Sequence, residues 1–431
     1  MVIAHTRLAN PLLGNLRILR FSAYDDDDNL LYYLPFMVST VLHFKFQLAG
    51  RGAWRNELSS HMRLFFDTIS SRMTNLSSLS ITALSAINFH SPRFIGLLAH
   101  ALEGLPNLKH VILPPRVIVG KIITSLSDHA RLVEINPAER ALSRGLSSTF
   151  SSTVSSTVLP KLGDAPFPSL RSLSFCAIPK VIRGFLSHPR LPTSQIAILH
   201  VQVLESSARD HERLDHLMNA IFSNCTNLAE LSISETIRGD DDPEKVENIF
   251  SFNCIRGILA CWNLTSLKIR HHSCLSWTAQ EVDELSFSLP SVTTLMLNET
   301  PVQAPQPAVT IAAALSSFAR HCSELRELGF CFDARSQPHA PVSKFKSLAV
   351  LHVGASPIDD SSESIEGIAA FLITILPVGC RMRWSSHGDE WSNDAANDEM
   401  DDGSFMGSPW QRIHQLQTLC RKVQKLLPGM I

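Results

Sequence analysis

One pattern of apolar positions recurs along the whole chain. In a stretch of six residues, the first, fourth and sixth are aliphatic or aromatic, as in "LRILRF" and "LTSLKI". The alternation of the fourth and sixth positions with polar residues predicts a strand that buries one face. Eleven copies begin at Leu16, Val41, Leu76, Leu108, Leu170, Ile196, Leu228, Leu264, Val292, Leu325 and Leu348. A weaker copy, "LVEI", begins at Leu132.

A second pattern, with the period of an α-helix, precedes many of the copies. Examples are "MRLFFDTISSRM" from Met62, "RFIGLLAHALEGL" from Arg93, "LDHLMNAIFSNC" from Leu214 and "IAAALSSFARHC" from Ile311. Alternating helices and strands predict an α/β fold with a parallel sheet. Counting the weak copy, the steps run from 23 residues (Leu325 to Leu348) to 38 residues (Leu132 to Leu170). This spacing predicts a leucine-rich-repeat solenoid, a horseshoe with a parallel concave sheet and outer helices.

The repeat resembles the ribonuclease-inhibitor-like class of leucine-rich repeats and, more narrowly, the fungal F-box and leucine-rich-repeat proteins. The resemblance rests on the ragged repeat length, the "NL..L.I" strand starts and a closing helix that ends "VQKLLP". It implies recognition of a substrate protein for a ubiquitin ligase of the SCF type. In that family the F-box precedes the repeats. Because the first repeat already begins at Asn15, one residue before its apolar pattern, we expect no F-box within this chain.

The positions between the buried ones should face outward on the concave side of the sheet, since strand side chains alternate. These residues are polar, mostly small and mixed in charge, as expected of a surface that binds a protein or peptide. The predicted partner-binding residues are His200, Gln202, Glu230, Ser232, Lys268, Arg270, Met296, Asn298, Glu327 and His352. Lys268 and Arg270, followed by two histidines, form either a patch for an acidic partner segment or a solvated strand end.

Three residues before the first apolar position, most copies carry another apolar residue or a cysteine. Cys225, Cys261 and Cys322 occupy this position and are expected to be small core residues.

Three segments depart from the repeat that spans residues 1–384. The Ser/Thr-rich stretch 143–168 is expected to be a surface loop inserted in the longest step. Residues 385–408 are acidic and poor in large apolar side chains, which predicts a disordered linker. Residues 409–428 should form an amphipathic helix with Ser408 as N-cap and Trp410, Ile413, Leu416, Leu419, Val423 and Leu426 on one stripe. This helix either caps the last repeat or binds a partner.

Composition limits the remaining functions. The 431 residues carry a formal net charge of −2, without the concentrated basic surface of a nucleic-acid binder. The longest apolar run, from Ile368, is well short of the roughly 20 residues that cross a bilayer. The start of the chain lacks the features of a secretory signal, and the nine cysteines show no paired spacing, so we expect a reduced cytoplasmic or nuclear location.

The sequence contains no phosphate-binding loop, nucleophile elbow or zinc-binding helix motif. We therefore expect no catalytic residues, no cofactor and no metal. The chain is interpreted as a non-enzymatic protein-interaction module, monomeric or a subunit of a larger complex, with a ubiquitin-ligase substrate receptor as one use. The alternative is a stand-alone scaffold or a regulator of another enzyme, such as a small GTPase.

Overall fold

The structure is a computed structural model that describes residues 13–24, 27–49, 60–83, 91–114, 117–118, 120–137, 160–204, 211–236, 251–271, 275–299, 301, 307–339, 343–384 and 408–426. The predicted acidic linker, 385–408, falls outside these ranges except for Ser408. Residues 143–159 of the predicted loop also fall outside these ranges. The rest of that loop, 160–168, includes the buried side chains of Leu162 and Phe167.

The contacts divide the chain into two compact units, Met1–Gln202 and Val203–Ile431. The elements of the first unit are β1 (Ile18–Tyr24), η2 (Asp27–Phe36), β2 (His43–Ala49), α1 (Ser60–Arg72), β3 (Ser78–Ala83), α2 (Pro92–Glu103), β4 (His110–Leu113), α3 (Gly120–Ser127), β5 (Glu134–Pro137), β6 (Ser172–Ala177), α5 (Pro179–Leu186) and η3 (Thr193–Gln195). Strand β7 (Ile198–Leu204) contains the boundary between the units.

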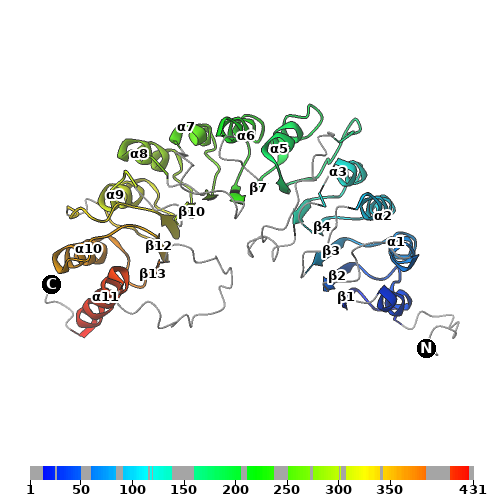
Figure 1. The fold of residues 1–431 in the computed structure, drawn as a ribbon, viewed down its shortest axis with the longest axis horizontal. Helices are drawn as coiled ribbons and strands as arrows, with labels where there is room; N and C mark the ends of the chain where they lie inside the picture. Colours follow the sequence, from blue (N-terminus) through cyan, green and yellow to red (C-terminus); the bar gives the residue numbers. More distant parts are fainter. Residues whose placement is uncertain are drawn as a thin grey trace. The chain divides into compact units, whose positions relative to one another are not determined.

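The second unit repeats the same alternation. Its elements are α6 (His211–Asn224), β8 (Glu230–Thr236), α7 (Phe252–Ile255), η5 (Arg256–Ala260), β9 (Ser266–Arg270), α8 (Ala279–Ser288), β10 (Thr294–Leu297), α9 (Ile311–His321), β11 (Glu327–Phe330), β12 (Val350–Gly354), α10 (Ser362–Ile375), β13 (Arg381–Trp384) and α11 (Pro409–Leu426). Figure 1 shows α1, α2 and α3 along one side of the strands of their unit.

Within each unit the strands are in chain order, and the pairs from β1 to β6 and from β8 to β13 are all parallel. The prediction of an α/β fold with a parallel sheet is confirmed. Each copy of the apolar pattern begins two residues before a strand, so that its third position opens the strand. These third positions pair with one another in the ladder, as in Ile18 with His43 and Glu327 with Val350.

The core contains the residues that the pattern selects. In the copy that forms β8, Leu228, Leu231 and Ile233 occupy the first, fourth and sixth positions and are 0%, 1% and 4% exposed. The described residues at these positions in the other copies are likewise buried, except Leu16 and Leu19 at the first strand, which are half-buried.

Side chains also link successive repeats through the backbone of the preceding turn. The amide of Asn75 donates to the carbonyl of Ser39 at 3.0 Å, and that of Asn107 donates to the carbonyl of Thr74 at 3.2 Å. The hydroxyl of Ser169 donates to the carbonyl of Ala130 at 2.8 Å. These hydrogen bonds provide partners for carbonyl groups in turns, which have no partner in the strand ladder.

The C-terminal helix α11 begins as predicted, with the hydroxyl of Ser408 accepting the N–H of Gln411 at 3.2 Å. It packs on α10 through Trp410 and Ile413, and the Trp410 indole donates to the carbonyl of Ser356 at 2.9 Å. The predicted apolar stripe is wrong at Leu419, which is 59% exposed, whereas Gln417 is buried.

Gln417 is buried in place of Leu419 because α11 packs on α10 with the helix face that carries Trp410, Ile413 and Gln417. Arg421 continues this face and donates to the carbonyl of Cys380 at 3.1 Å, beside the last strand. The helix therefore covers the end of the second unit near β13.

Candidate protein-binding face

The ten predicted partner-binding residues differ widely in exposure. Lys268 is exposed. The half-buried residues are His200, Glu230, Ser232, Arg270 and Glu327. The buried ones are Gln202, Met296, Asn298 and His352. His200 and Gln202 belong to β7, and the other eight belong to the second unit. Gln202, Met296, Asn298 and His352 are thus not exposed to solvent as predicted, although the ladder keeps Met296 and His352 in the same row as Lys268.

Met296 is buried because the next strand provides space for it. Gly329 of β11 lies beside it, and a Cβ on that glycine would lie 2.6 Å from the Met296 Cε atom. The thioether thus covers the backbone of β11. A side chain at position 329 would therefore require the end of the Met296 side chain to move.

Asn298 is buried because β10 ends at Leu297 and the chain turns there. Its φ of 49° lies in the left-handed region, which asparagine tolerates better than most residues. The side-chain oxygen accepts the backbone N–H of His271 at 2.9 Å, which ties the end of β10 to the end of β9.

His352 of β12 is buried beside a carboxylate of β11. Its Nε2 atom lies 3.0 Å from Oε1 of Glu327, whose side chain is 34% exposed. The hydrogen bond from His352 lowers the pKa of the Glu327 carboxyl, and the charges of His352, Lys268 and Arg383 act in the same direction. Glu327 is therefore a fixed, partly accessible anion on this face.

Sequence reasoning missed a second polar pair at the ends of β8 and β9. Nε2 of His271 lies 3.1 Å from Oε2 of Glu235, and the two side chains are only 4% and 6% exposed. Nothing in the local sequence distinguishes Glu235 from a solvated strand-end carboxylate, because its burial depends on a strand that follows about 30 residues later.

Glu299 was also missed and lies deepest in this face. It is 1% exposed, and neither carboxylate oxygen accepts a hydrogen bond from another of the described residues. Burial raises the pKa of this carboxyl, against the fields of its own backbone N–H, Arg270 and His352. Burial also lowers the pKa of the Arg270 guanidinium, and Glu299 opposes that change.

The backbone of Glu299 is fixed by the end of β12. Its carbonyl accepts the N–H of Ala355 at 3.0 Å, directly after Gly354, whose φ is 52°. A Cβ on Gly354 would lie 1.7 Å from that carbonyl oxygen. The close approach of the two backbones thus requires glycine, and it holds Glu299 over the sheet.

The cysteines that the repeat pattern placed in the core are indeed buried, with Cys225 0% and Cys322 2% exposed. Burial raises the pKa of each of these two thiols to about 12, so almost none is thiolate at neutral pH. The described residues contain no group of three or more His, Cys, Asp or Glu side chains that could hold a metal ion. In the same part of the chain, no helix is both long and apolar enough to cross a membrane.

No family model matches this chain, and no curated protein matches it either. The functional inference therefore rests on the residues and their geometry.

Proposed function

We propose that the chain is a leucine-rich-repeat protein that acts without catalysis, as a module that recognises a partner protein on the sheet face of its second unit. The support comes from the strand register. Ladder pairing aligns the third and fifth pattern positions into two rows that run across six successive strands. The rows are Glu230–Ser266–Thr294–Glu327–Val350–Arg381 and Ser232–Lys268–Met296–Gly329–His352–Arg383.

These rows combine both signs of charge with small residues over a rigid support. Lys268 on β9 and Glu327 on β11 offer opposite charges on either side of β10, and Arg383 is exposed at the far end. Repeat proteins use extended surfaces of this kind to bind other proteins. Complementary charge would then supply specificity and a faster association rate.

The strand register and the recurring apolar pattern support the leucine-rich-repeat assignment within this proposal. The ubiquitin-ligase role that the family resemblance implies stays a prediction, as does the alternative of a scaffold or regulator without a ubiquitin link.

Affinity capture from cells that express the chain tests this proposal. The bait carries either the native residues or the pair Lys268→Glu and Glu327→Lys, which exchanges two charges on the face and keeps the net charge. The control is Arg256→Glu on η5, whose side chain is 56% exposed, pairs with Glu284 at 3.3 Å and lies 5.9 Å from the centroid of the Phe252 ring.

We expect a protein that the native and control baits retain and that the charge-exchanged bait loses. Retention of the same proteins by all three baits would show that this face does not select the partner. Hydrolytic or transferase turnover by the purified protein would contradict the non-enzymatic part of the proposal.

A further inference from the structure

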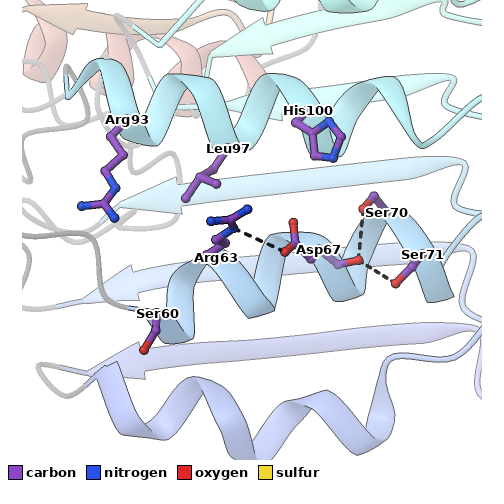
Figure 2. A pocket seen from close by; sticks show the side chains of 8 residues that line it. All are labelled: Ser60, Arg63, Asp67, Ser70, Ser71, Arg93, Leu97 and His100. Atoms are coloured by element: carbon purple, nitrogen blue, oxygen red, sulfur yellow. Dashed lines mark hydrogen bonds and ion pairs between the residues drawn. The ribbon is translucent and has the colours of Figure 1, made fainter.

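The helical side of the first unit carries an open groove of about 800 Å³ between α1 and α2 (Figure 2). Its lining comes from both helices and is polar with one aliphatic residue. The lining residues are Ser60, Arg63, Asp67, Ser70, Ser71, Arg93, Leu97 and His100. None of them belongs to the sheet face discussed above.

Two guanidinium groups face this groove from opposite sides. Figure 2 shows Arg63 reaching from α1 toward α2 and Arg93 reaching from α2 toward α1, with Leu97 between the helices. Nε of Arg63 lies 3.9 Å from Oδ2 of Asp67, and the arginine side chain remains 75% exposed. An exposed pair at this distance contributes little and leaves the arginine available to another anion.

The surrounding helices add positive charge. Helices α1, α2, α3 and α5 carry six Lys and Arg residues (Arg63, Arg72, Arg93, Lys121, Lys180 and Arg183) against two acids (Asp67 and Glu103), and η2, which contacts α1, adds Asp27 and Asp28. These helices together thus carry two more cations than acids, whereas the whole chain has a net charge of −2. Such a field raises the encounter rate with acidic partners.

Three further lining side chains, those of Ser70, Ser71 and His100, have partners within their own helices. The hydroxyls of Ser70 and Ser71 both donate to the backbone carbonyl of Asp67, at 3.0 and 2.6 Å. His100 lies 3.9 Å from Glu103 and is 70% exposed. The two arginines are thus the groups in the groove best able to bind a ligand, and both are suited to carboxylates through their planar, forked donors.

We propose that this groove binds an acidic, extended segment of a partner protein, with its carboxylates on Arg63 and Arg93 and an apolar side chain on Leu97. The carboxylate of Asp67 and the apolar surface of Leu97 disfavour a nucleic-acid backbone, which needs a continuous row of cations. The groove is a second interaction surface beyond the proposed function. Its assignment stands or falls independently of the sheet face.

The test uses the full-length chain and a short fluorescein-labelled peptide rich in Asp and Glu with a single Leu, followed by fluorescence anisotropy. We expect Arg93→Glu and Arg63→Glu each to weaken binding by roughly tenfold or more, because each removes a charge-assisted contact and adds repulsion. The matched control is Arg72→Glu, which changes the same charge on an exposed position of α1 outside the groove. It should weaken binding by less than about twofold at physiological salt.

A charge-swapped pair provides the positive arm. The double variant Arg63→Glu and Arg93→Glu should bind a peptide in which Lys replaces the acids, while the native chain should not. Absence of binding by the native chain, or equal weakening by Arg72→Glu and Arg93→Glu, would overturn the assignment. Tighter binding of a single-stranded RNA of equal charge would overturn it in favour of a nucleic-acid surface.

Discussion

Gly354 offers the sharpest test of the close packing in the second unit. Replacement by alanine places a Cβ only 1.7 Å from the carbonyl oxygen of Glu299. The φ of 52° adds a penalty of about 1–2 kcal/mol for any residue with a side chain. Because the collision is with backbone, the chain must move, which breaks the hydrogen bond from Ala355 to Glu299 at a further cost of about 0.5–1.5 kcal/mol. We expect Gly354→Ala to lower the free energy of unfolding by roughly 1.5–3.5 kcal/mol.

Gly367 provides the matched control, since it is the same substitution in the same unit. It lies inside helix α10, and a Cβ there would meet nothing within 4 Å. Alanine at this position should stabilise by about 0.5–1 kcal/mol, because it restricts the unfolded chain and favours the helix. Urea unfolding followed by circular dichroism should therefore move the two midpoints in opposite directions. Equal midpoints for the two variants would refute the close approach of Gly354 to Glu299.

Three further substitutions or treatments probe other features. Leu231→Ala should lower the free energy of unfolding by about 2–5 kcal/mol, because the side chain is 1% exposed. Leu419→Ala, at a position that is 59% exposed, should change it by no more than about 0.5 kcal/mol. Similar melting temperatures for the two variants would contradict the repeat register. Burial raises the pKa of Glu299, so the folded state holds its proton more tightly and loses stability as pH rises from the unfolded pKa through the folded one. Glu299→Gln should thus raise the melting temperature at pH 8 more than at pH 4. An equal change at both pH values would refute the burial of the Glu299 carboxyl. Iodoacetamide should label the exposed Cys420 in the folded chain and leave Cys322, whose pKa is raised to about 12, unlabelled until denaturant is added. Mass spectrometry after a short pulse measures both sites, and labelling of Cys322 before Cys420 would contradict its burial.

Periodicity was sufficient to predict the strands and their buried residues. Even the weak copy at Leu132 forms a strand, β5, because its neighbours on both sides supply backbone partners in the same register. A short apolar pattern gains certainty when it is repeated, since each strand must pair with the next.

The polar interior of the second unit could not be predicted in the same way. Glu299 follows a strand, where a carboxylate is normally solvated, and its burial results from the approach of Gly354 about 55 residues later. Alternation put Asn298 and Met296 on the outer side of the sheet, but it does not predict exposure, which is lost where a strand ends or where a glycine on the next strand leaves space for a side chain. Long-range backbone contacts of this kind leave no periodic signal.

The strand register also bears on how this chain could change over evolutionary time. Pairing is counted from the third position of each copy, although neighbouring copies start between 23 and 38 residues apart. Residues can therefore be gained or lost between one strand and the next without shifting any pair in the ladder. A deletion of one residue inside a strand would instead exchange its buried and exposed faces, because side chains alternate. Variation among descendants of this gene should accordingly gather between the strands, while the length of each strand stays fixed.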